Sequence, residues 1–440
     1  MKTLPFLAAA LMALTSVTAR AEEPRPTQWF EDARFGMFIH FGLYSVPAGV
    51  WNGVRMTRND YAEWIRYQQG WPKPGGIPKA EYDTLLAQFN PQGFDADAWI
   101  REAKNAGMKY FLITAKHHDG FALWDSKVSD YNVVKATPFK RDILAELVTA
   151  CRKQDIKVGF YYSHWLDWEY PGGGLPPWPE TKGDWTVTQP SDEAFEGYWT
   201  HKCLPQVKEL MVNFKPDFMW FDSWGDQAHH FLTEDRLNRL IHLIHENQPT
   251  CLINSRIGTE KGVDYLSMGD NFFPKEGFDR PWETSGTLNH SWGYHRLDYK
   301  WKTTSQLLRW LVDNASRGGN YQLNVGPTGD GIFQPAAIKR LREIGAWMSV
   351  NGGAIYGSRP AKLPEPAWGR LTRTDGRLNA FVYDPKPGAV LEIAGLATLP
   401  AKGWVLETHE EISITKTLGG VRFTLPAVLP DDRIVVIALD

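Results

Sequence analysis

Between about residue 30 and residue 350, short apolar runs alternate with longer segments whose apolar residues recur every three or four positions. Nearly continuous apolar runs are typical of strands buried on both faces, and a period near 3.6 is typical of helices. The order therefore predicts βα units around a parallel sheet. Strands are predicted at Phe35–Phe41, Lys109–Ala115, Lys157–Tyr162, Asp217–Phe221, Cys251–Asn254 and Tyr321–Val325.

Helical periodicity fills the segments between these runs. Helices are predicted at Asp97–Asn105, Arg141–Lys153, Glu193–Phe214, Glu234–Glu246, Thr304–Ala315 and Pro335–Ser349. The number of units approaches that of an eight-stranded barrel, with two strands not visible in the pattern. We therefore expect an α/β fold of the (β/α)8-like TIM barrel type over residues 22–357.

The pattern changes after Gly357. Short alternating runs follow, separated by Gly, Pro and Asp, at Leu378–Tyr383, Val390–Ile393, Val421–Thr424 and Arg433–Ala438. Alternation with a period of two predicts strands that are buried on one face only. We expect residues 358–440 to form a small C-terminal antiparallel β-sandwich domain.

The N-terminus has the three parts of a secretory signal peptide. Lys2 precedes an apolar run, and Ala19-Arg20-Ala21 follows it as a cleavage site. We expect residues 1–21 to be removed and the protein to be periplasmic or secreted, with no membrane association afterwards. Loss of Lys2 and Arg20 would change the net charge from −3 to −5, which argues against nucleic acid as a partner.

Composition adds two points. The chain has 20 Trp residues, which is typical of large aromatic cores and of surfaces that contact carbohydrate. Its three cysteines, Cys151, Cys203 and Cys251, are widely spaced and are expected to be buried free thiols instead of a disulfide framework or a zinc site. We expect no cofactor, and the oligomeric state, including a homo-oligomer, stays open.

Two carboxylates stand among aromatic residues. Asp222 lies in the segment 220–225 between two Trp residues, and Glu283 follows Trp282 and precedes Trp292. Sugars present apolar ring faces that stack on indoles, so a pair of acids flanked by Trp residues suits cleavage of a glycosidic bond. Taken singly, Asp222 could instead cap a strand end and Glu283 could begin a helix.

Histidines follow two of the predicted strands. His40 ends the first strand, and His117 and His118 follow Lys116 at the end of the second. Because neighbours in a strand face opposite ways, we expect one of the adjacent pair to face the pocket and the other to support its wall. Adjacent His residues lack the spacing of a zinc site, so no metal is expected.

Further polar and aromatic residues lie at or near the ends of predicted strands or beside an acidic residue. Six of them are candidates to contact one monosaccharide. They are the acid–indole pair Glu63 and Trp64, the strand-end tyrosines Tyr161 and Tyr162, the cation Arg256, and Trp124 after the His pair. For Glu63 and Trp64 a surface helix is an equal alternative. The Pro/Gly-rich segment 170–179 is expected either to shape the rim of the pocket or to act as a spacer.

Seven stretches in order resemble the α-L-fucosidases of glycoside hydrolase family 29. They are 35–45, 62–65, 115–126, 159–163, 218–222, 282–294 and 318–331, of which Lys-His-His-Asp-Gly-Phe and Leu-Asn-Val-Gly-Pro are the most specific. The resemblance implies a barrel with a C-terminal β-sandwich and metal-independent, exo-acting hydrolysis of terminal α-L-fucosides with retention, through a covalent glycosyl-Asp intermediate.

The resemblance also implies residue roles. Asp222 matches the nucleophile and Glu283 the acid/base, with Glu63 as the next candidate for the acid. The residues that match or are expected to contact the sugar are His40, Glu63, Trp64, His117, His118, Tyr161, Tyr162, Arg256, Trp124 and Trp292. The expected partner is a fucosylated oligosaccharide or glycoconjugate.

Three alternatives remain open. The first is activity on sugars that differ from fucose at C6, such as L-galactosides, because one added hydroxyl gives modest discrimination. The second is a non-catalytic carbohydrate-binding protein on the same barrel. The third is a metal-dependent hydrolase. Ser223 stands where many family members have Gly, so the preference for the leaving group is also open.

Overall fold

The computed structural model describes residues 26–56, 61–67, 76–176 and 188–440. Its largest element is a parallel sheet of eight strands whose spatial order follows the chain. The strands are β1 (Phe35–Ile39), β4 (Tyr110–Lys116), β5 (Lys157–Tyr162), β6 (Phe218–Phe221), β7 (Leu252–Ile253), β8 (Leu266–Ser267), β9 (Trp282–Thr287) and β10 (Asn320–Val325). A parallel bridge between Asn254 and Tyr265 joins the two ends of the sheet, so the strands curl into a barrel.

The six predicted barrel strands are confirmed, and the two missing ones are β8 and β9. β8 has only two residues, which is too short to appear as an apolar run. β9 has the sequence Trp-Glu-Thr-Ser-Gly-Thr, and all six residues are buried. The strand was not recognised because its buried residues are mostly polar.

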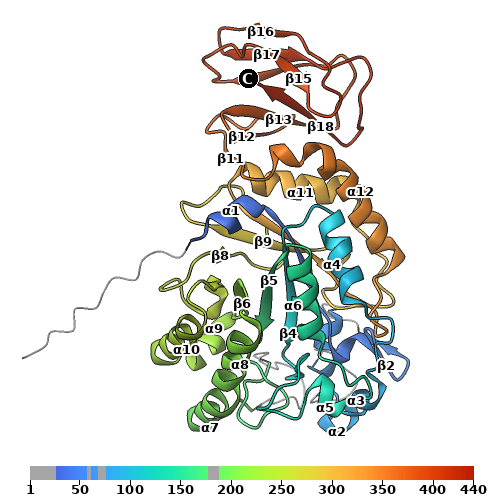
Figure 1. The fold of residues 1–440 in the computed structure, drawn as a ribbon, viewed down its shortest axis with the longest axis vertical. Helices are drawn as coiled ribbons and strands as arrows, with labels where there is room; N and C mark the ends of the chain where they lie inside the picture. Colours follow the sequence, from blue (N-terminus) through green and yellow to red (C-terminus); the bar gives the residue numbers. More distant parts are fainter. Residues whose placement is uncertain (1–25, 57–60, 68–75, 177–187) are drawn as a thin grey trace, which may run out of the picture.

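The predicted helices are also present around the barrel (Figure 1). They are α4 (Ala96–Asn105), α6 (Ile143–Lys153), α7 (Asp192–Tyr198), α8 (Leu204–Phe214), α10 (Glu234–Asn247), α11 (Thr304–Ser316) and α12 (Pro335–Asn351). Side-chain caps begin several of them: Asp95 accepts from Ala98 N, Asp142 from Ala145 N, and Thr303 forms a capping box with Gln306. The single helix predicted at 193–214 is divided by a π-helical turn at Trp199–Cys203.

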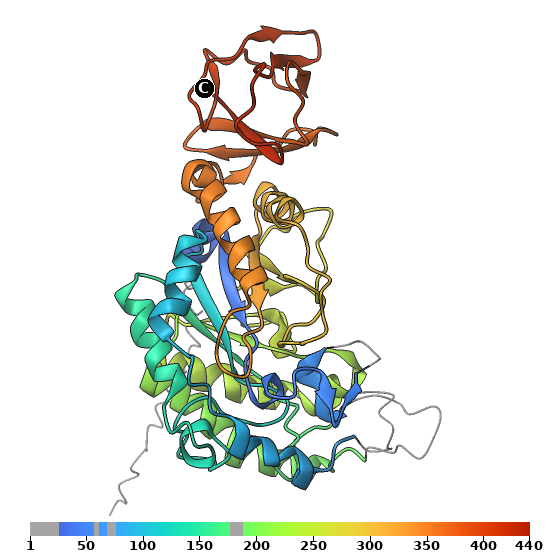
Figure 2. The ribbon, with the colours of Figure 1, turned by 90° about the vertical axis from the view of Figure 1, so that its right-hand side faces the viewer.

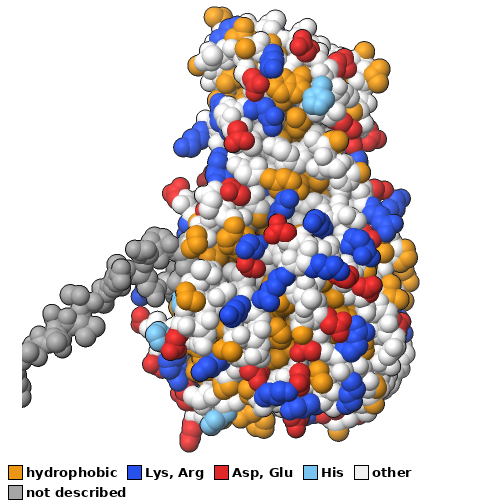
Figure 3. Space-filling model, in the orientation of Figure 1, with side chains coloured by type: hydrophobic (Ala, Val, Ile, Leu, Met, Phe, Trp, Pro, Cys, Tyr) orange, Lys and Arg blue, Asp and Glu red, His pale blue; other side chains and the backbone are white. Residues whose placement is uncertain are grey.

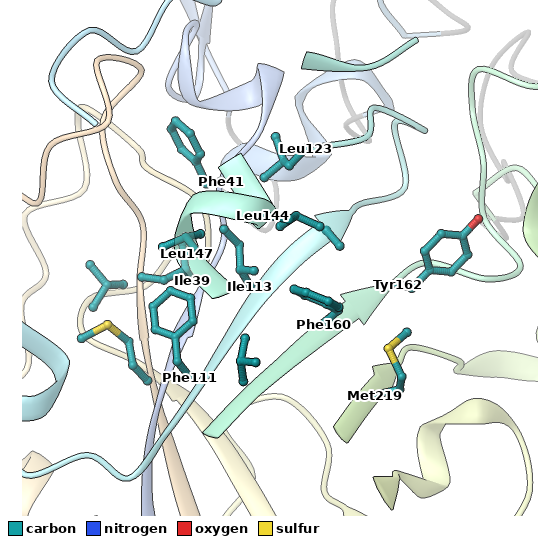
Figure 4. Packing of buried hydrophobic residues seen from close by; sticks show 14 of the residues in the cluster. Ile39, Phe41, Phe111, Ile113, Leu123, Leu144, Leu147, Phe160, Tyr162 and Met219 are labelled. Carbon is teal, nitrogen blue, oxygen red and sulfur yellow. The ribbon is translucent and has the colours of Figure 1, made fainter. Parts of the chain in front are cut away.

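The two faces of the barrel strands belong to different clusters. Outward residues such as Phe111, Phe160 and Tyr162 join the main core under the surrounding helices, as Figure 4 shows. Inward residues form a separate, largely aromatic cluster. Its members include Phe38, Tyr110, Leu112, Tyr161, Phe218, Trp220, Tyr265 and Trp292. The barrel interior is therefore filled by side chains.

Residues after α12 form two antiparallel sheets. One contains β11 (Arg359–Pro360), β12 (Gly369–Thr374), β13 (Arg377–Tyr383), β18 (Ile434–Leu439) and β15 (Gly403–Val405); the other contains β14 (Val390–Ala394), β17 (Gly420–Thr424) and β16 (Ile414–Lys416). Their facing residues share a core of their own, which makes a small β-sandwich. The four strands predicted here, β13, β14, β17 and β18, are present.

The sandwich packs on α11 and α12, as Figures 1 and 2 show. Arg34, just before β1, donates to Gly318 O, just before β10, and to Ser358 O beside the sandwich. The sandwich therefore lies near the beginnings of the barrel strands. In a parallel barrel the opposite end, where the strands finish, is the end that carries active sites.

The expected signal peptide, 1–21, lies outside the described residues. The three cysteines are free and buried, as expected. Within the described residues no helix is long and apolar enough to span a membrane, and Figure 3 shows acidic and basic side chains interspersed over one face.

Candidate active site

A cavity of about 510 Å³ opens at the carboxyl ends of the barrel strands. Every barrel strand or the loop after it, except β10, contributes to its wall, together with the loop and 3-10 helix around Tyr61–Tyr67. The lining residues are Phe38, His40, Tyr61, Glu63, Trp64, Tyr67, His117, His118, Tyr161, Trp220, Asp222, Ser223, Trp224, Arg256, Ser267, Gly269, Asp270 and Trp292. Aromatic walls with a few carboxylates and His residues suit one sugar ring.

Asp222 follows β6 directly and lines the cavity with 8% of its surface exposed. Tyr161 Oη donates to its Oδ2 at 2.9 Å, and Arg256 Nη2 donates to its Oδ1. Burial alone would raise the pKa of Asp222, but Arg256 and the Tyr161 hydroxyl lower it below its usual value. Asp222 is therefore an ionised carboxylate at neutral pH, as a nucleophile must be.

Arg256 holds a second carboxylate. Its Nη1 donates to Asp270 Oδ1 at 2.9 Å and to Met268 O at 3.1 Å, while its Nη2 contacts Asp222. Asp270 follows β8 and its side chain is 45% exposed, whereas the Asp222 side chain is 12% exposed. The two acids thus flank one guanidinium, with Asp270 on the solvent side.

Two His side chains in the cavity are fixed in one tautomer. Asn324 Oδ1 can only accept, so the 2.7 Å hydrogen bond must be donated by His40 Nδ1. Ser163 donates its hydroxyl proton to Leu166 O at 2.8 Å, so it accepts from His118 Nδ1 at 2.6 Å. Burial lowers the pKa of His40 to about 4 and that of His118 to about 3, so both rings are neutral. Each is left with Nε2 as an acceptor for a sugar hydroxyl.

His117 and His118 both line the cavity, which differs from the expectation that only one would. β4 ends at Lys116, and its pairing with β5 is irregular between Thr114 and Lys116. The alternation of a strand therefore does not extend to the two His residues. The His117 ring stacks on Tyr161, with centroids 5.3 Å apart and an interplanar angle of 10°.

Glu63 and Trp64 lie in a 3-10 helix (Ala62–Tyr67) at the cavity, not on an outer surface helix. Glu63 is buried, and its Oε2 accepts from Gly293 N at 2.8 Å. Burial raises the pKa of Glu63 to about 8, so this acid holds a proton at neutral pH. Trp64 packs against His118, with ring centroids 4.8 Å apart.

The structure excludes two expected contacts from the cavity wall. Tyr162 faces outward, where its hydroxyl donates to Gln206 Oε1 at 2.9 Å, because it alternates with the inward Tyr161 along β5. Trp124 is buried, and its Nε1 donates to Glu209 Oε2 at 3.1 Å on the helical side of the barrel. Both residues stabilise the outer layer instead of contacting sugar.

Glu283 also lies outside the cavity wall, contrary to the expected pairing with Asp222. It is the second residue of β9 and is fully buried inside the barrel. Its Oε1 accepts from Trp220 Nε1 at 2.7 Å and from Ser267 Oγ at 2.9 Å. A residue near the beginning of a barrel strand lies below the floor of a site built at the strand ends.

Several lining residues were not predicted from the sequence, namely Phe38, Tyr61, Tyr67, Ser267, Gly269 and Asp270. Asp270 and Ser267 belong to or follow the two-residue β8, which the apolar pattern does not reveal. Phe38 is one of several apolar residues in β1, and only its alternation with the outward Met37 and Ile39 could have placed it inside.

The chain is similar to known proteins over most of its length. The family model for alpha-L-fucosidase matches residues 12–353. The tissue alpha-L-fucosidase of Bos taurus is 33% identical over 419 residues, which cover 91% of this chain and 85% of the relative.

Solved structures of alpha-L-fucosidases are also similar to this chain. Alpha-L-fucosidase isoenzyme 1 from Paenibacillus thiaminolyticus has 35% identity and a TM-score of 0.81 over 94% of this chain and 98% of that chain. A GH29 alpha-L-fucosidase from Bacteroides thetaiotaomicron, trapped as a covalent intermediate in complex with 2-fluoro-fucosyl fluoride, has 31% identity and a TM-score of 0.82 over 98% of this chain and 99% of that chain. The chain belongs to the α-L-fucosidases of glycoside hydrolase family 29.

Proposed function

We propose that Asp222 is the nucleophile and Asp270 the acid/base of a retaining α-L-fucosidase. The type of reaction, in which a covalent glycosyl intermediate forms and is hydrolysed, is supported by the family to which the chain belongs. The observation that carries the residue assignment is Arg256, whose two terminal nitrogens contact Asp222 and Asp270. The two carboxyl groups are thus held on one guanidinium at the cavity, which suits the close pair of acids that a retaining enzyme needs.

In the first step an Asp222 carboxylate oxygen attacks C1 of the fucose. The bond from C1 to the glycosidic oxygen breaks, and Asp270 gives its proton to that oxygen. In the second step Asp270, now a carboxylate, takes a proton from water, whose oxygen attacks C1 and releases Asp222. Two inversions at C1 leave the product with the α-configuration.

Burial favours Asp270 over the two glutamates for the acid/base role. The group that protonates the leaving oxygen must lie on the solvent side of the sugar, where the rest of the glycan and the incoming water are found. Asp270 is half exposed, whereas Glu63 and Glu283 are 2% and 0% exposed. The raised pKa of Glu63, at about 8, keeps Glu63 as a second candidate because it holds a proton at neutral pH.

Azide separates the two roles through the anomer that it yields. We expect Asp222→Gly to abolish hydrolysis and, with azide, to give β-fucosyl azide, because azide then occupies the space of the nucleophile. We expect Asp270→Ala to lose about 10²–10⁴-fold in kcat/KM on fucosides with poor leaving groups. Azide should rescue that variant and give α-fucosyl azide, because it attacks the intermediate on Asp222.

Glu63→Gln and Glu283→Gln are the matched controls. α-Fucosyl azide from the Glu63 variant, with no rescue of the Asp270 variant, would transfer the acid/base role to Glu63. Hydrolysis by Asp222→Gly at the wild-type rate would contradict the assignment of Asp222 as the nucleophile. The rates of hydrolysis of 4-nitrophenyl α-L-fucoside and of the α-L-galactoside, measured on the same preparation, test whether the enzyme discriminates between sugars that differ at C6.

Export from the cytoplasm is part of the proposal. It rests on the signal-like segment that ends at Ala21 and on the absence of charge in the apolar run before it. Sequencing the N-terminus of the protein recovered from the periplasm or medium tests it, and a mature chain that begins at residue 22 is the expected result.

A further inference from the structure

Glu283 is a buried acid that the proposed reaction does not use. It lies inside the barrel among aromatic side chains and is fully buried. Burying a carboxyl group in such surroundings costs free energy unless its hydrogen bonds are satisfied. Its Oε1 accepts two hydrogen bonds, from the Trp220 indole and the Ser267 hydroxyl, whereas its Oε2 has no hydrogen-bond partner among the described residues. Both donors line the catalytic cavity. Glu283 therefore contacts the floor of the site from beneath.

The first hydrogen bond supports the groups that hold Asp222. The Trp220 ring stacks on Tyr161, with centroids 5.4 Å apart and an interplanar angle of 21°, and Tyr161 donates to Asp222 Oδ2. The Arg256 guanidinium lies over the same Trp220 ring, 4.9 Å from its centroid, and pairs with Asp222 Oδ1. Both donors to the nucleophile thus rest on one indole, and Glu283 fixes the nitrogen of that indole.

The second hydrogen bond supports the other side of Arg256. Ser267 pairs with Glu283 in the register of β8 and β9, and its backbone N–H donates to Ser255 Oγ at 3.1 Å. Ser255 immediately precedes Arg256. The residues after Ser267 supply Met268 O and Asp270, which accept from Arg256 Nη1. The position of Arg256 is therefore linked to Glu283 through two independent contacts.

We propose that Glu283 is a positioning residue that, through Trp220 and Ser267, holds Arg256 and Tyr161 in place around the nucleophile. This inference rests on the proposed role of Asp222. Burial raises the pKa of Glu283 to about 8, so at neutral pH the carboxyl is neutral. Its doubly bonded oxygen accepts from both donors without placing a charge beneath the sugar.

The test compares Glu283→Gln with Glu283→Leu. The Gln carbonyl oxygen still accepts from Trp220 and Ser267, so we expect kcat/KM to fall by less than about fivefold. Leu accepts nothing, and a shift of the order of 1 Å at Arg256 costs about 100-fold in kcat/KM. The loss should be in kcat, and it should be equal for 4-nitrophenyl fucoside and for fucosides with poor leaving groups.

A double-mutant cycle with Trp220→Phe separates this role from a general loss of packing. Phe keeps a ring under Arg256 but removes the indole N–H, so Trp220→Phe and Glu283→Leu should not be additive in kcat/KM. Glu283→Leu should also move the acid limb of the kcat/KM profile to higher pH, because a displaced Arg256 no longer lowers the pKa of Asp222. Circular dichroism confirms that each variant is folded.

Three results would overturn the inference. One is wild-type kcat/KM in Glu283→Leu, and another is additivity in the cycle. The third is a loss in Glu283→Gln that is confined to poor leaving groups and is rescued by azide as the α-anomer, which would make Glu283 the acid. If Glu283→Leu does not fold, Glu283→Gln and Trp220→Phe still decide. Failure of the Asp222 assignment is detected separately, by the anomer of the azide product from Asp222→Gly.

Discussion

At the scale of single residues, Arg256 determines the charge of Asp222. It contacts both Asp222 and Asp270, and its own pKa is raised far above the ordinary value because these two carboxylates outweigh the effect of burial. Asp222 is buried, and burial alone would favour its neutral form. The ionised form of Asp222, the proposed nucleophile, is therefore a property of the Arg–Asp pair and not of Asp222 alone.

This pairing predicts how acid affects a variant. In Arg256→Gln the burial of Asp222 is no longer opposed by a cation, so the pKa of Asp222 should rise. Because the proposed mechanism needs ionised Asp222 to attack C1, kcat/KM should then fall as the pH is lowered through the higher pKa, at pH values where the wild type keeps its activity. The acid limb of the kcat/KM profile, measured from pH 3 to 7, checks this.

Arg422→Gln is the matched control, since Arg422 pairs with Glu392 on the C-terminal sandwich. Its acid limb should coincide with that of the wild type. An unchanged limb in Arg256→Gln would mean that a group other than Asp222 governs the acid side of the profile.

At the scale of secondary structure elements, β5 places neighbouring tyrosines on opposite sides of the barrel wall. Tyr161 faces the cavity and donates to Asp222. Tyr162 belongs to the outer hydrophobic layer that Figure 4 shows, and it donates to Gln206. Hydrogen bonds to charged groups contribute about 1.5–3 kcal/mol. We therefore expect Tyr161→Phe to lose about 10–100-fold in kcat/KM with little loss of stability.

Tyr162→Phe should show the reverse behaviour. It leaves the buried Gln206 oxygen without this donor, which costs about 1–3 kcal/mol of unfolding free energy. Its kcat/KM should stay within about twofold of the wild type. Urea unfolding and steady-state kinetics on both variants check the pair, and a large kinetic loss in Tyr162→Phe would contradict the outward orientation.

The elements also explain which parts of the site the sequence predicts. Strands that bury apolar residues on both faces, such as β1 and β4, are visible in the pattern, and so the sequence indicates His40, His117 and His118 at their ends as cavity residues. It does not show that both members of the adjacent His pair line the cavity. β8 and β9 are not visible, because one has two residues and the other buries polar side chains. The place of Asp270 at the cavity and the buried position of Glu283 beneath it are set by these two strands. Aromatic neighbours in the sequence therefore indicate a sugar site without showing which acid reaches it.

At the scale of the whole molecule, the sandwich is joined to the barrel by a continuous core. Phe381 and Ile434 of the sandwich belong to the main hydrophobic cluster, and Trp347 of α12 donates to Ile434 O at 3.1 Å. Ion pairs between Arg309 and Asp384 and between Arg370 and Asp313 surround this contact. The interface lies near the strand beginnings, away from the cavity. This arrangement favours a structural brace over a module that binds the substrate beside the active site.

A brace predicts that damage at the interface lowers the stability of both parts together. Phe381 is fully buried, so Phe381→Ala should cost about 3–5 kcal/mol of unfolding free energy. Heat should unfold the variant in one transition, and activity should be lost at that same temperature. Below it, kcat/KM should equal that of the wild type, because the cavity is not altered. Val428→Ala, at a side chain that is 81% exposed on the same sandwich, should change neither quantity. Two separate transitions in Phe381→Ala, with activity surviving the first, would show that the barrel is stable without the sandwich.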